Sequence, residues 1–186
     1  MPIEAINKNN NIFEKLVPEN TSYNYISYEN ENSIMPILEL IKNNPSNLLN
    51  ILSPTLISGS KTDIEYHADQ AIQLAQHDDI EFRRRSLFAI GKIEFKDNND
   101  LSEKAFQQLE KSANEELDDQ LLGTIIKSIV IFCKYNQVSI NRITKIIETA
   151  SEKGNDHALH AISENFGFNN EHLNDDLVDI YLSQLK

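Results

Sequence analysis

The sequence predicts an all-α protein, a right-handed α-solenoid of about four antiparallel helix pairs. Apolar residues recur at helical spacing, the helix starts repeat at a constant interval, and the chain holds only 5 Gly and 5 Pro. Such scarcity of turn residues disfavours a many-stranded sandwich and suits long helices with short joints. We expect residues 1–32 to form an N-terminal segment with a short helix and a linker, and residues 33–186 to form a single repeat domain.

The N-terminal part of the repeat domain predicts one helical hairpin. Ser33 can cap a first helix that Asn44 ends. Pro45 suits the first turn of a second helix, which we expect to end near Gly59 and to bend at Pro54. The preceding linker carries three tyrosines in polar surroundings, which either lie back on the first helix or form an aromatic binding arm; they are Tyr23, Tyr25 and Tyr28.

Three further helix pairs follow at a regular interval. Their first helices are expected to start near residues 63, 101 and 139, and their second helices near 80, 118 and 156. Both series repeat at about 38 residues, an interval typical of helical repeat arrays in which each hairpin buries its apolar face against its neighbours. A last helix, 174–185, has no partner in this scheme.

The second helix of the middle pair is apolar on almost its whole circumference. Its segment 121–132 reads LLGTIIKSIVIF. A helix of this kind must be buried on several sides, so we expect it to be the spine of the array. A four-helix bundle could also bury such a helix, but it would not explain the regular interval. Cys133 follows this segment, and we expect it to be buried as a small apolar side chain.

One segment carries a family signature. Residues 77–93, HDDIEFRRRSLFAIGKI, place Asp79 in a joint, then the hydrophobic–Arg pair Phe82-Arg83, then the pair Ile90-Gly91. In this order the segment resembles a HEAT-type repeat. The resemblance implies an internal polar ladder that includes Arg83, and a scaffold or binding role. It is clear for one repeat only, since Gly123 stands in place of the Arg in the next unit.

The charge balance disfavours nucleic acid as a direct partner. The chain has 29 acidic and 17 basic residues and a net charge of −12, whereas phosphate binding needs clustered Lys and Arg. The acidity favours either capture of a basic protein or simple solubility. The start, MPIEAINKNNN, has no apolar leader and no stretch reaches the length of a membrane span. The prediction is a cytoplasmic protein that does not bind membranes.

No arrangement of residues predicts catalysis, a metal or a cofactor. His157 and His160 share a helix face near Asp156 and Glu164, but a metal site needs three or four ligands and no second pair is visible. These histidines therefore indicate a solvated polar face. There is no Gly-x-Ser-x-Gly elbow and no phosphate-binding glycine loop. We expect a protein that is not an enzyme.

The joints that precede the second helices are rich in carboxylates, and a stacked array would align them along one edge. Helix capping explains one or two acids per joint, while these joints supply more. The excess is either structural or part of a partner-binding edge. The carboxylates proposed for partner binding are Asp78, Asp79, Glu81, Glu115, Glu116, Asp118, Asp119 and Asp156.

Phe88 is a further candidate for partner binding. It lies on the polar side of its helix near Arg84 and Lys92. It either packs under a neighbouring repeat or stands exposed as an aromatic anchor.

These features favour a non-catalytic protein-binding module. The specific hypothesis is an immunity protein, an inhibitor whose carboxylates occlude a basic, nuclease-type bacterial toxin. The alternative is a general HEAT-like scaffold or adaptor, or a fragment of a larger solenoid. A third hypothesis, a HEAT-like enzyme or lyase, has only the basic run Arg83-Arg84-Arg85 to support it. Fold analogy alone cannot choose among them.

Overall fold

The computed structural model describes residues 31–153 and 156–164, and every regular element in these ranges is a helix. The elements are α4 (Glu31–Asn43), α5 (Pro45–Leu48), the 3₁₀ helix η1 (Leu49–Ile51), α6 (Leu52–Gly59), α7 (Ile64–Leu74), α8 (Ile80–Lys92), α9 (Asn99–Glu115), α10 (Asp119–Tyr135), α11 (Ile140–Lys153) and α12 (Asp156–Ser163). The last predicted helix, 174–185, and the tyrosine linker lie outside the described residues. None of the described helices combines the length and the apolar character that crossing a bilayer requires.

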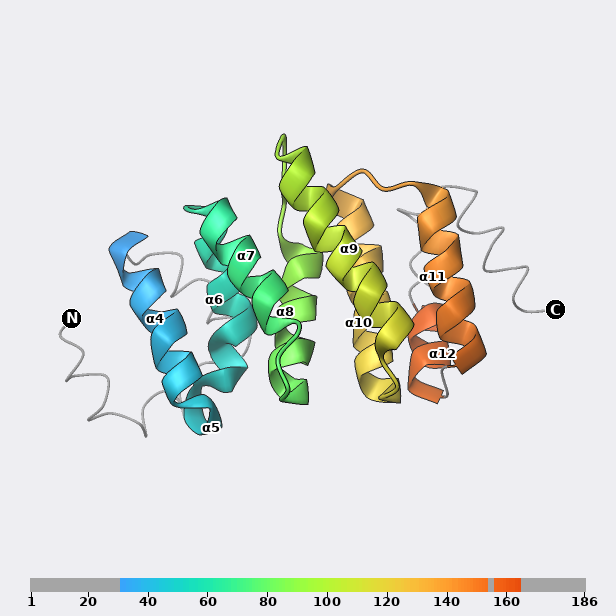
Figure 1. The fold of residues 1–186 in the computed structure, drawn as a ribbon, viewed down its shortest axis with the longest axis horizontal. Coiled ribbons are helices and arrows are strands. Elements are labelled where there is room, and N and C mark those ends of the chain that lie inside the picture. Colours follow the sequence, from blue (N-terminus) through green and yellow to red (C-terminus); the bar gives the residue numbers. More distant parts are fainter. Residues whose placement is uncertain (1–30, 154–155, 165–186) are drawn as a thin grey trace.

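The helices lie in two rows, and the chain passes from one row to the other at each joint (Figure 1). In one row α6 packs against α8, α8 against α10, and α10 against α12. In the other row α7 packs against α9, and α9 against α11. Contacts across the rows join α4 to α6, α7 to α8, α9 to α10 and α11 to α12.

Side-chain caps fix where several helices begin. Asp63 Oδ1 accepts a hydrogen bond from Tyr66 N (3.0 Å), and Asn98 Oδ1 accepts one from Leu101 N (3.2 Å). Each cap satisfies a backbone N–H that has no partner within its helix. The later helices therefore start within two residues of the positions expected from the sequence.

Two local predictions near α4 and α6 are wrong. α4 begins at Glu31, so Ser33 lies within the helix and does not cap it. The single helix expected over 45–59 is instead divided into α5, η1 and α6, although it does end at Gly59. A proline ring clashes with the carbonyl group four residues before it and supplies no N–H. Restarting the helix at Leu52 places Pro54 in the first turn of α6, where both problems disappear.

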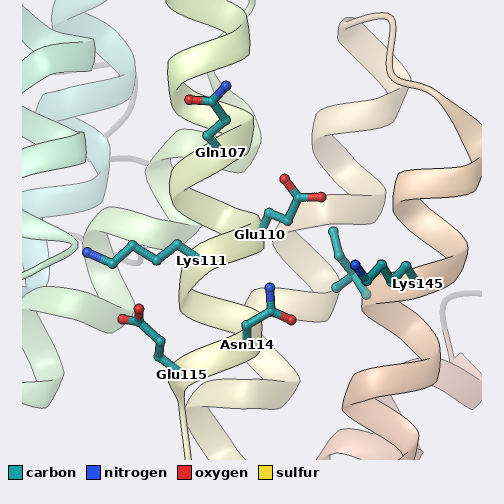
Figure 2. Close-up of a pocket in the computed structure, with 7 residues that line it drawn as sticks. Gln107, Glu110, Lys111, Asn114, Glu115 and Lys145 are labelled. Atoms are coloured by element: carbon teal, nitrogen blue, oxygen red, sulfur yellow. The ribbon is translucent and has the colours of Figure 1, made fainter.

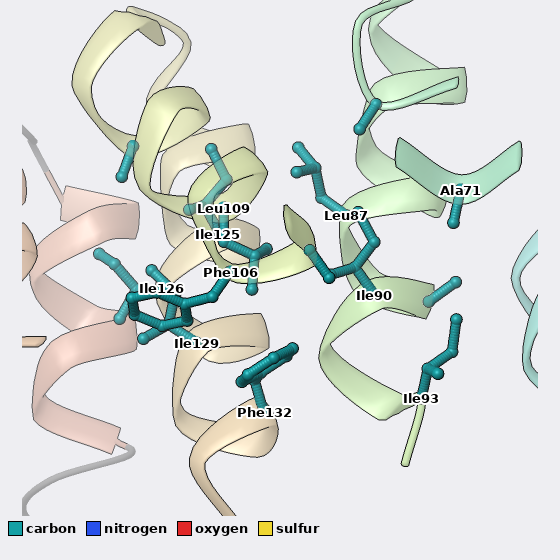
Figure 3. Packing of buried hydrophobic residues seen from close by; sticks show 14 of the residues in the cluster. Ala71, Leu87, Ile90, Ile93, Phe106, Leu109, Ile125, Ile126, Ile129 and Phe132 are labelled. Carbon is teal, nitrogen blue, oxygen red and sulfur yellow. The ribbon is translucent and has the colours of Figure 1, made fainter. Parts of the chain in front are cut away.

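α10 is the buried spine that the sequence predicts. It packs against α8, α9, α11 and α12, and its apolar side chains meet those of both rows (Figure 3). The ring of Phe132 lies 5.6 Å from that of Phe95 and 5.5 Å from that of Phe106. The buried residues of α10 are Leu121, Leu122, Gly123, Ile125, Ile126, Ser128, Ile129, Val130 and Phe132.

Asn136, just after α10, holds the segment that leaves α8. Its Nδ2 donates to Ile93 O (3.2 Å) and to Phe132 O (3.1 Å), and its Oδ1 accepts from Phe95 N (3.1 Å). The side chain is buried and thereby satisfies backbone groups that water cannot reach. This residue joins the end of α10 to the end of α8.

Two glycines allow neighbouring helices of the same row to approach closely. A Cβ atom on Gly91 of α8 would lie 2.6 Å from Ser128 O and 2.8 Å from Ser128 Cα of α10. A Cβ atom on Gly123 of α10 would lie 3.0 Å from His157 O of α12. Backbone atoms cannot rotate away as a side chain can, so the α8–α10 contact requires glycine.

His67 of α7 occupies a similar space beside Gly59 of α6. A Cβ atom at Gly59 would lie 2.2 Å from His67 Nε2. The imidazole is buried, its Nδ1 lies 2.8 Å from Asp63 O, and its Nε2 has no hydrogen-bond partner. Burial lowers the pKa of His67 below its usual value and thereby favours the neutral ring.

We predict that Gly91→Ala destabilises the protein more than Gly123→Ala. Alanine gains about 1 kcal/mol of helix propensity over glycine at either position. At Gly91 the added methyl group meets backbone atoms, and the strain should leave a net loss of about 1–3 kcal/mol. At Gly123 the tighter contact and the propensity gain should nearly cancel. Urea unfolding of the two variants measures the difference, and equal stability would contradict the close α8–α10 contact.

Candidate functional site

The acidic joints lie along one edge of the described structure. The turns that lead into α8 and α10, and the start of α12, are all at the lower edge in Figure 1. All eight carboxylates proposed for partner binding belong to these segments. We call this region the joint edge. Its geometry separates carboxylates that hold the fold together from carboxylates that face solvent.

Glu116 binds within its own joint and to the preceding one. Its Oε1 accepts hydrogen bonds from Leu117 N and Asp118 N, each at 3.0 Å. Its Oε2 lies 3.3 Å from Arg83 Nη2. Arg83 Nη1 also donates to His77 O (3.2 Å) and Asp78 O (2.9 Å). Arg83 and Glu116 therefore tie the α7–α8 joint to the α9–α10 joint. Arg83 therefore has a structural contact, but its acidic partner is Glu116. Asp79 instead caps α8.

Asp79, Asp118 and Asp119 satisfy helix N-termini. Asp79 Oδ1 accepts from Glu81 N (2.8 Å) at the start of α8, and Asp118 Oδ1 accepts from Leu121 N (2.8 Å) at the start of α10. Asp119 lies in α10 but caps α12, where it accepts hydrogen bonds from His157 N (2.8 Å) and Ala158 N (3.2 Å). Each cap is a structural function for a residue that the sequence also marks as a binding candidate.

Arg84 adds one more carboxylate of the joint edge, Glu81, to those with a partner and also approaches Asp118. It forms an ion pair with Glu81, and its Nη2 lies 4.0 Å from Asp118 Oδ1. Asp79, Glu81, Glu116, Asp118 and Asp119 therefore all have partners in the fold. Helix capping, the Arg83–Glu116 pair between joints and the Arg84–Glu81 pair within α8 explain five of the eight carboxylates.

Asp78, Glu115 and Asp156 are the solvent-facing carboxylates of the joint edge. All three are exposed, and their side chains form no hydrogen bond or ion pair within the described ranges. Asp78 contributes its backbone carbonyl to Arg83, while its carboxylate stays in water. These three residues are free to meet a partner without loss of a contact in the fold.

Leu117 is a site residue that sequence reasoning missed. Its side chain is 89% exposed, the largest exposure among the exposed large apolar residues of the described structure. It stands between Glu116 and Asp118, and Glu116 holds the backbone of both Leu117 and Asp118. The signal in the sequence was a lone apolar residue within the acidic run EELDD.

Phe88 lies outside the joint edge, on the exposed side of α8. Its ring is half-buried, and Lys92 Nζ lies 5.2 Å from the ring centroid. The ammonium group covers one face of the ring in a cation–π contact. Phe88 is therefore neither a fully buried packing residue nor a freely exposed anchor.

A groove of about 460 Å³ lies between α9 and α11, in the row that also contains α7 (Figure 2). It is lined mainly by amide and charged side chains: Gln107, Glu110, Lys111, Asn114, Glu115 and Lys145, with Ile146. Arg142 of α11 donates to Glu110, one of the lining residues (3.3 and 2.8 Å), and to Glu103 (2.8 Å). These hydrogen bonds raise the pKa of Arg142, and those from Arg142 lower the pKa of Glu103.

Three residues were considered for catalysis or metal binding: His157, His160 and Cys133. His157 and His160 are exposed on α12. Cys133 is partly buried, and burial raises the pKa of its thiol to about 12, which leaves it un-ionised at neutral pH. Among residues 31–153 and 156–164, no three His, Cys, Asp or Glu side chains are grouped so that they could hold a metal ion.

Compared with known proteins, the chain matches no family model, no curated protein and no solved structure.

We predict that Asp119→Ala destabilises the protein by about 1–2 kcal/mol, because two backbone N–H groups of α12 lose their acceptor. Asp156→Ala is the matched control, since Asp156 lies at the same end of α12 but bonds to nothing in the described fold. It should cost only a few tenths of a kcal/mol through the helix dipole. Thermal unfolding of both variants measures the difference. Equal losses would show that Asp119 does not cap α12.

Proposed function

We propose that this chain is a non-catalytic protein-binding module that uses its joint edge to bind a basic protein. In this proposal the two rows of helices are the layers of a right-handed α-solenoid of the HEAT type, built from antiparallel helix pairs. The joints of such an array present a rigid, continuous edge, because each is fixed by contacts with the next.

The exposed side chain of Leu117 is the observation that supports this proposal most directly. An apolar side chain in water gains free energy when a partner covers it, and interface hot spots combine such an anchor with a polar rim. Glu115 and Asp118 flank Leu117 and supply that rim. The hydrogen bonds from Leu117 N and Asp118 N to Glu116 pre-order the turn, so little conformational entropy is lost on binding.

Charge indicates which kind of partner fits. Asp78, Glu115 and Asp156 are free carboxylates on an edge where the capping aspartates also carry negative charge. Together with the net charge of −12, they favour fast association with a cationic surface. The partner is therefore a protein with an apolar pocket bordered by Lys and Arg.

The specific form of the proposal is an immunity protein. Nuclease active sites are cationic because they bind phosphates. A row of carboxylates can occupy such a site in place of a nucleic acid, and Leu117 can add a contact that a nucleic acid lacks. The inhibitor would act by occlusion and would need no catalytic residue of its own.

A scaffold or adaptor role is the second candidate, and the α9–α11 groove favours it. The groove offers amide and charged side chains of both signs on the row opposite α10, which suits a polar peptide. This role predicts several binding partners and no protection from a toxin.

The proposed function predicts a specific effect of neutralising the free carboxylates. The triple variant Asp78→Asn, Glu115→Gln, Asp156→Asn should associate about tenfold more slowly with the basic toxin that this proposal expects to be encoded beside the gene. Leu117→Ala should mainly speed dissociation, with a loss of about 1–2 kcal/mol. Stopped-flow association and surface plasmon resonance measure the two effects, and survival of toxin-expressing cells measures protection.

The control for this experiment is a triple variant with the same charge change elsewhere. Asp69→Asn, Glu94→Gln, Glu148→Gln removes three exposed carboxylates away from the joint edge. It should bind and protect like the unmodified protein. If both triple variants slow association equally, net charge alone explains capture. If the toxin does not bind the unmodified protein, the immunity proposal is wrong.

A further inference from the structure

Cationic side chains gather on the side of α8 and α10 that the rest of the fold leaves open. α8 contacts α6, α7, α9 and α10, so its remaining side faces away from the row of α7, α9 and α11. At helical spacing Arg84, Arg85 and Lys92 share the side of α8 opposite its buried Ser86 and Ile90, and Lys127 and Lys134 share the side of α10 opposite its buried Ile125 and Ile129. None of these five side chains is buried. We call this surface the α8–α10 face.

The fold neutralises two of these five cations and leaves three. Arg84 pairs with Glu81, and Lys127 Nζ lies 3.7 Å from Glu164 Oε2. Arg85, Lys92 and Lys134 form no ion pair in the described structure, and the Nε of Arg85 is shielded from water without a hydrogen-bond partner. An anion from solvent cannot reach this shielded nitrogen, so the terminal nitrogens of the Arg85 guanidinium, which are not shielded in this way, are the donors available to a carboxylate.

The spacing of these charges is fixed. Gly91 holds α8 against the backbone of α10, and residues 85 and 92 lie two helical turns apart, about 10 Å along the axis. A peptide in the polyproline II conformation repeats every three residues with a rise of about 3.1 Å per residue, so its side chains three positions apart lie on one face about 9 Å apart. Carboxylates three residues apart in such a peptide can therefore meet Arg85 and Lys92 together, while Lys134 lies on the adjacent helix.

We propose that the α8–α10 face binds a short acidic segment of a partner protein. This surface is separate from the joint edge and has the opposite charge, so it goes beyond the proposed function. Carboxylates of the segment would pair with Arg85, Lys92 and Lys134, and the half-buried Ile131 of α10 offers an apolar contact beside them.

Two features favour a short acidic polypeptide over a nucleic acid. Lys92 covers a face of Phe88, which makes that aromatic ring a poor stacking platform for a base. Carboxylates also border the face at both ends: Glu81 and Asp118 where α8 and α10 begin, and Glu94 and Asp97 after α8. A long polyanion would be repelled at either end, whereas a segment of a few residues fits between them.

The test uses a fluorescein-labelled peptide with Glu at every third position and Leu and Ser between. Fluorescence anisotropy at about 0.15 M salt, where exposed charges are screened beyond about 8 Å, measures its binding to the full chain. The variant Arg85→Gln, Lys92→Gln, Lys134→Gln should weaken binding about tenfold, as expected when three exposed ion pairs are lost. The matched control Lys61→Gln, Lys104→Gln, Lys145→Gln removes three exposed cations elsewhere and should change binding less than twofold.

Each other outcome would overturn the inference. Equal weakening by the two triple variants would indicate non-specific charge attraction. Absence of peptide binding to the unmodified protein would remove the site. An oligothymidylate of equal charge that binds as tightly as the peptide would indicate a nucleic acid as ligand. Thermal unfolding of both variants confirms that each is folded, and because the joint edge is unchanged in them, toxin binding reports separately on the proposed function.

Discussion

The close contact between α8 and α10 is the constraint on which the rest of the structure depends. It exists because Gly91 leaves no side chain between its own backbone and that of Ser128. With the two helices this close, Phe132 of α10 reaches both Phe95 and Phe106. The Asn136 side chain can then bind the backbone of Ile93 and Phe95, which follow α8. α10 is then covered on four sides by other helices. The alignment of the joints along one edge follows from this packing.

The joint edge shows how one type of side chain can serve both structure and recognition. A carboxylate that caps a helix or pairs with Arg83 stabilises the stack, and its charge still contributes to the field outside the protein. Only the carboxylates without such partners can be changed without disturbing the fold. Asp118 and Asp119, the most conspicuous acidic pair in the sequence, are structural caps. Asp78 and Glu115 are the cleaner probes of binding.

The features that could be predicted from the sequence are those that depend on a local pattern of residues. The all-round apolar character of α10 and the Asp residues before α8 and α10 are visible in short windows, so the spine and the helix starts could be predicted. The break before Pro54 was misplaced, because a proline disrupts the turn before itself and not the turn in which it stands. The pairing of Arg83 with Glu116, the capping of α12 by Asp119 and the exposure of Leu117 could not be predicted. The Arg83–Glu116 pair and the Asp119 caps join residues 33 to 39 positions apart in the chain. They depend, as the exposure of Leu117 does, on how whole joints are aligned in space. The resemblance to HEAT repeats indicated a role for Arg83 but not its partner.

Native-state hydrogen exchange measures whether the neighbours of α10 and the joint edge depend on this helix for their stability. The amides of 121–132 should exchange only when the whole protein unfolds, and they should share one free energy of opening with the buried amides of α8. The amides of α4 and α5, the first of the described helices, should open at lower free energy. Exchange of α10 by local opening, as fast as that of α4, would contradict the account.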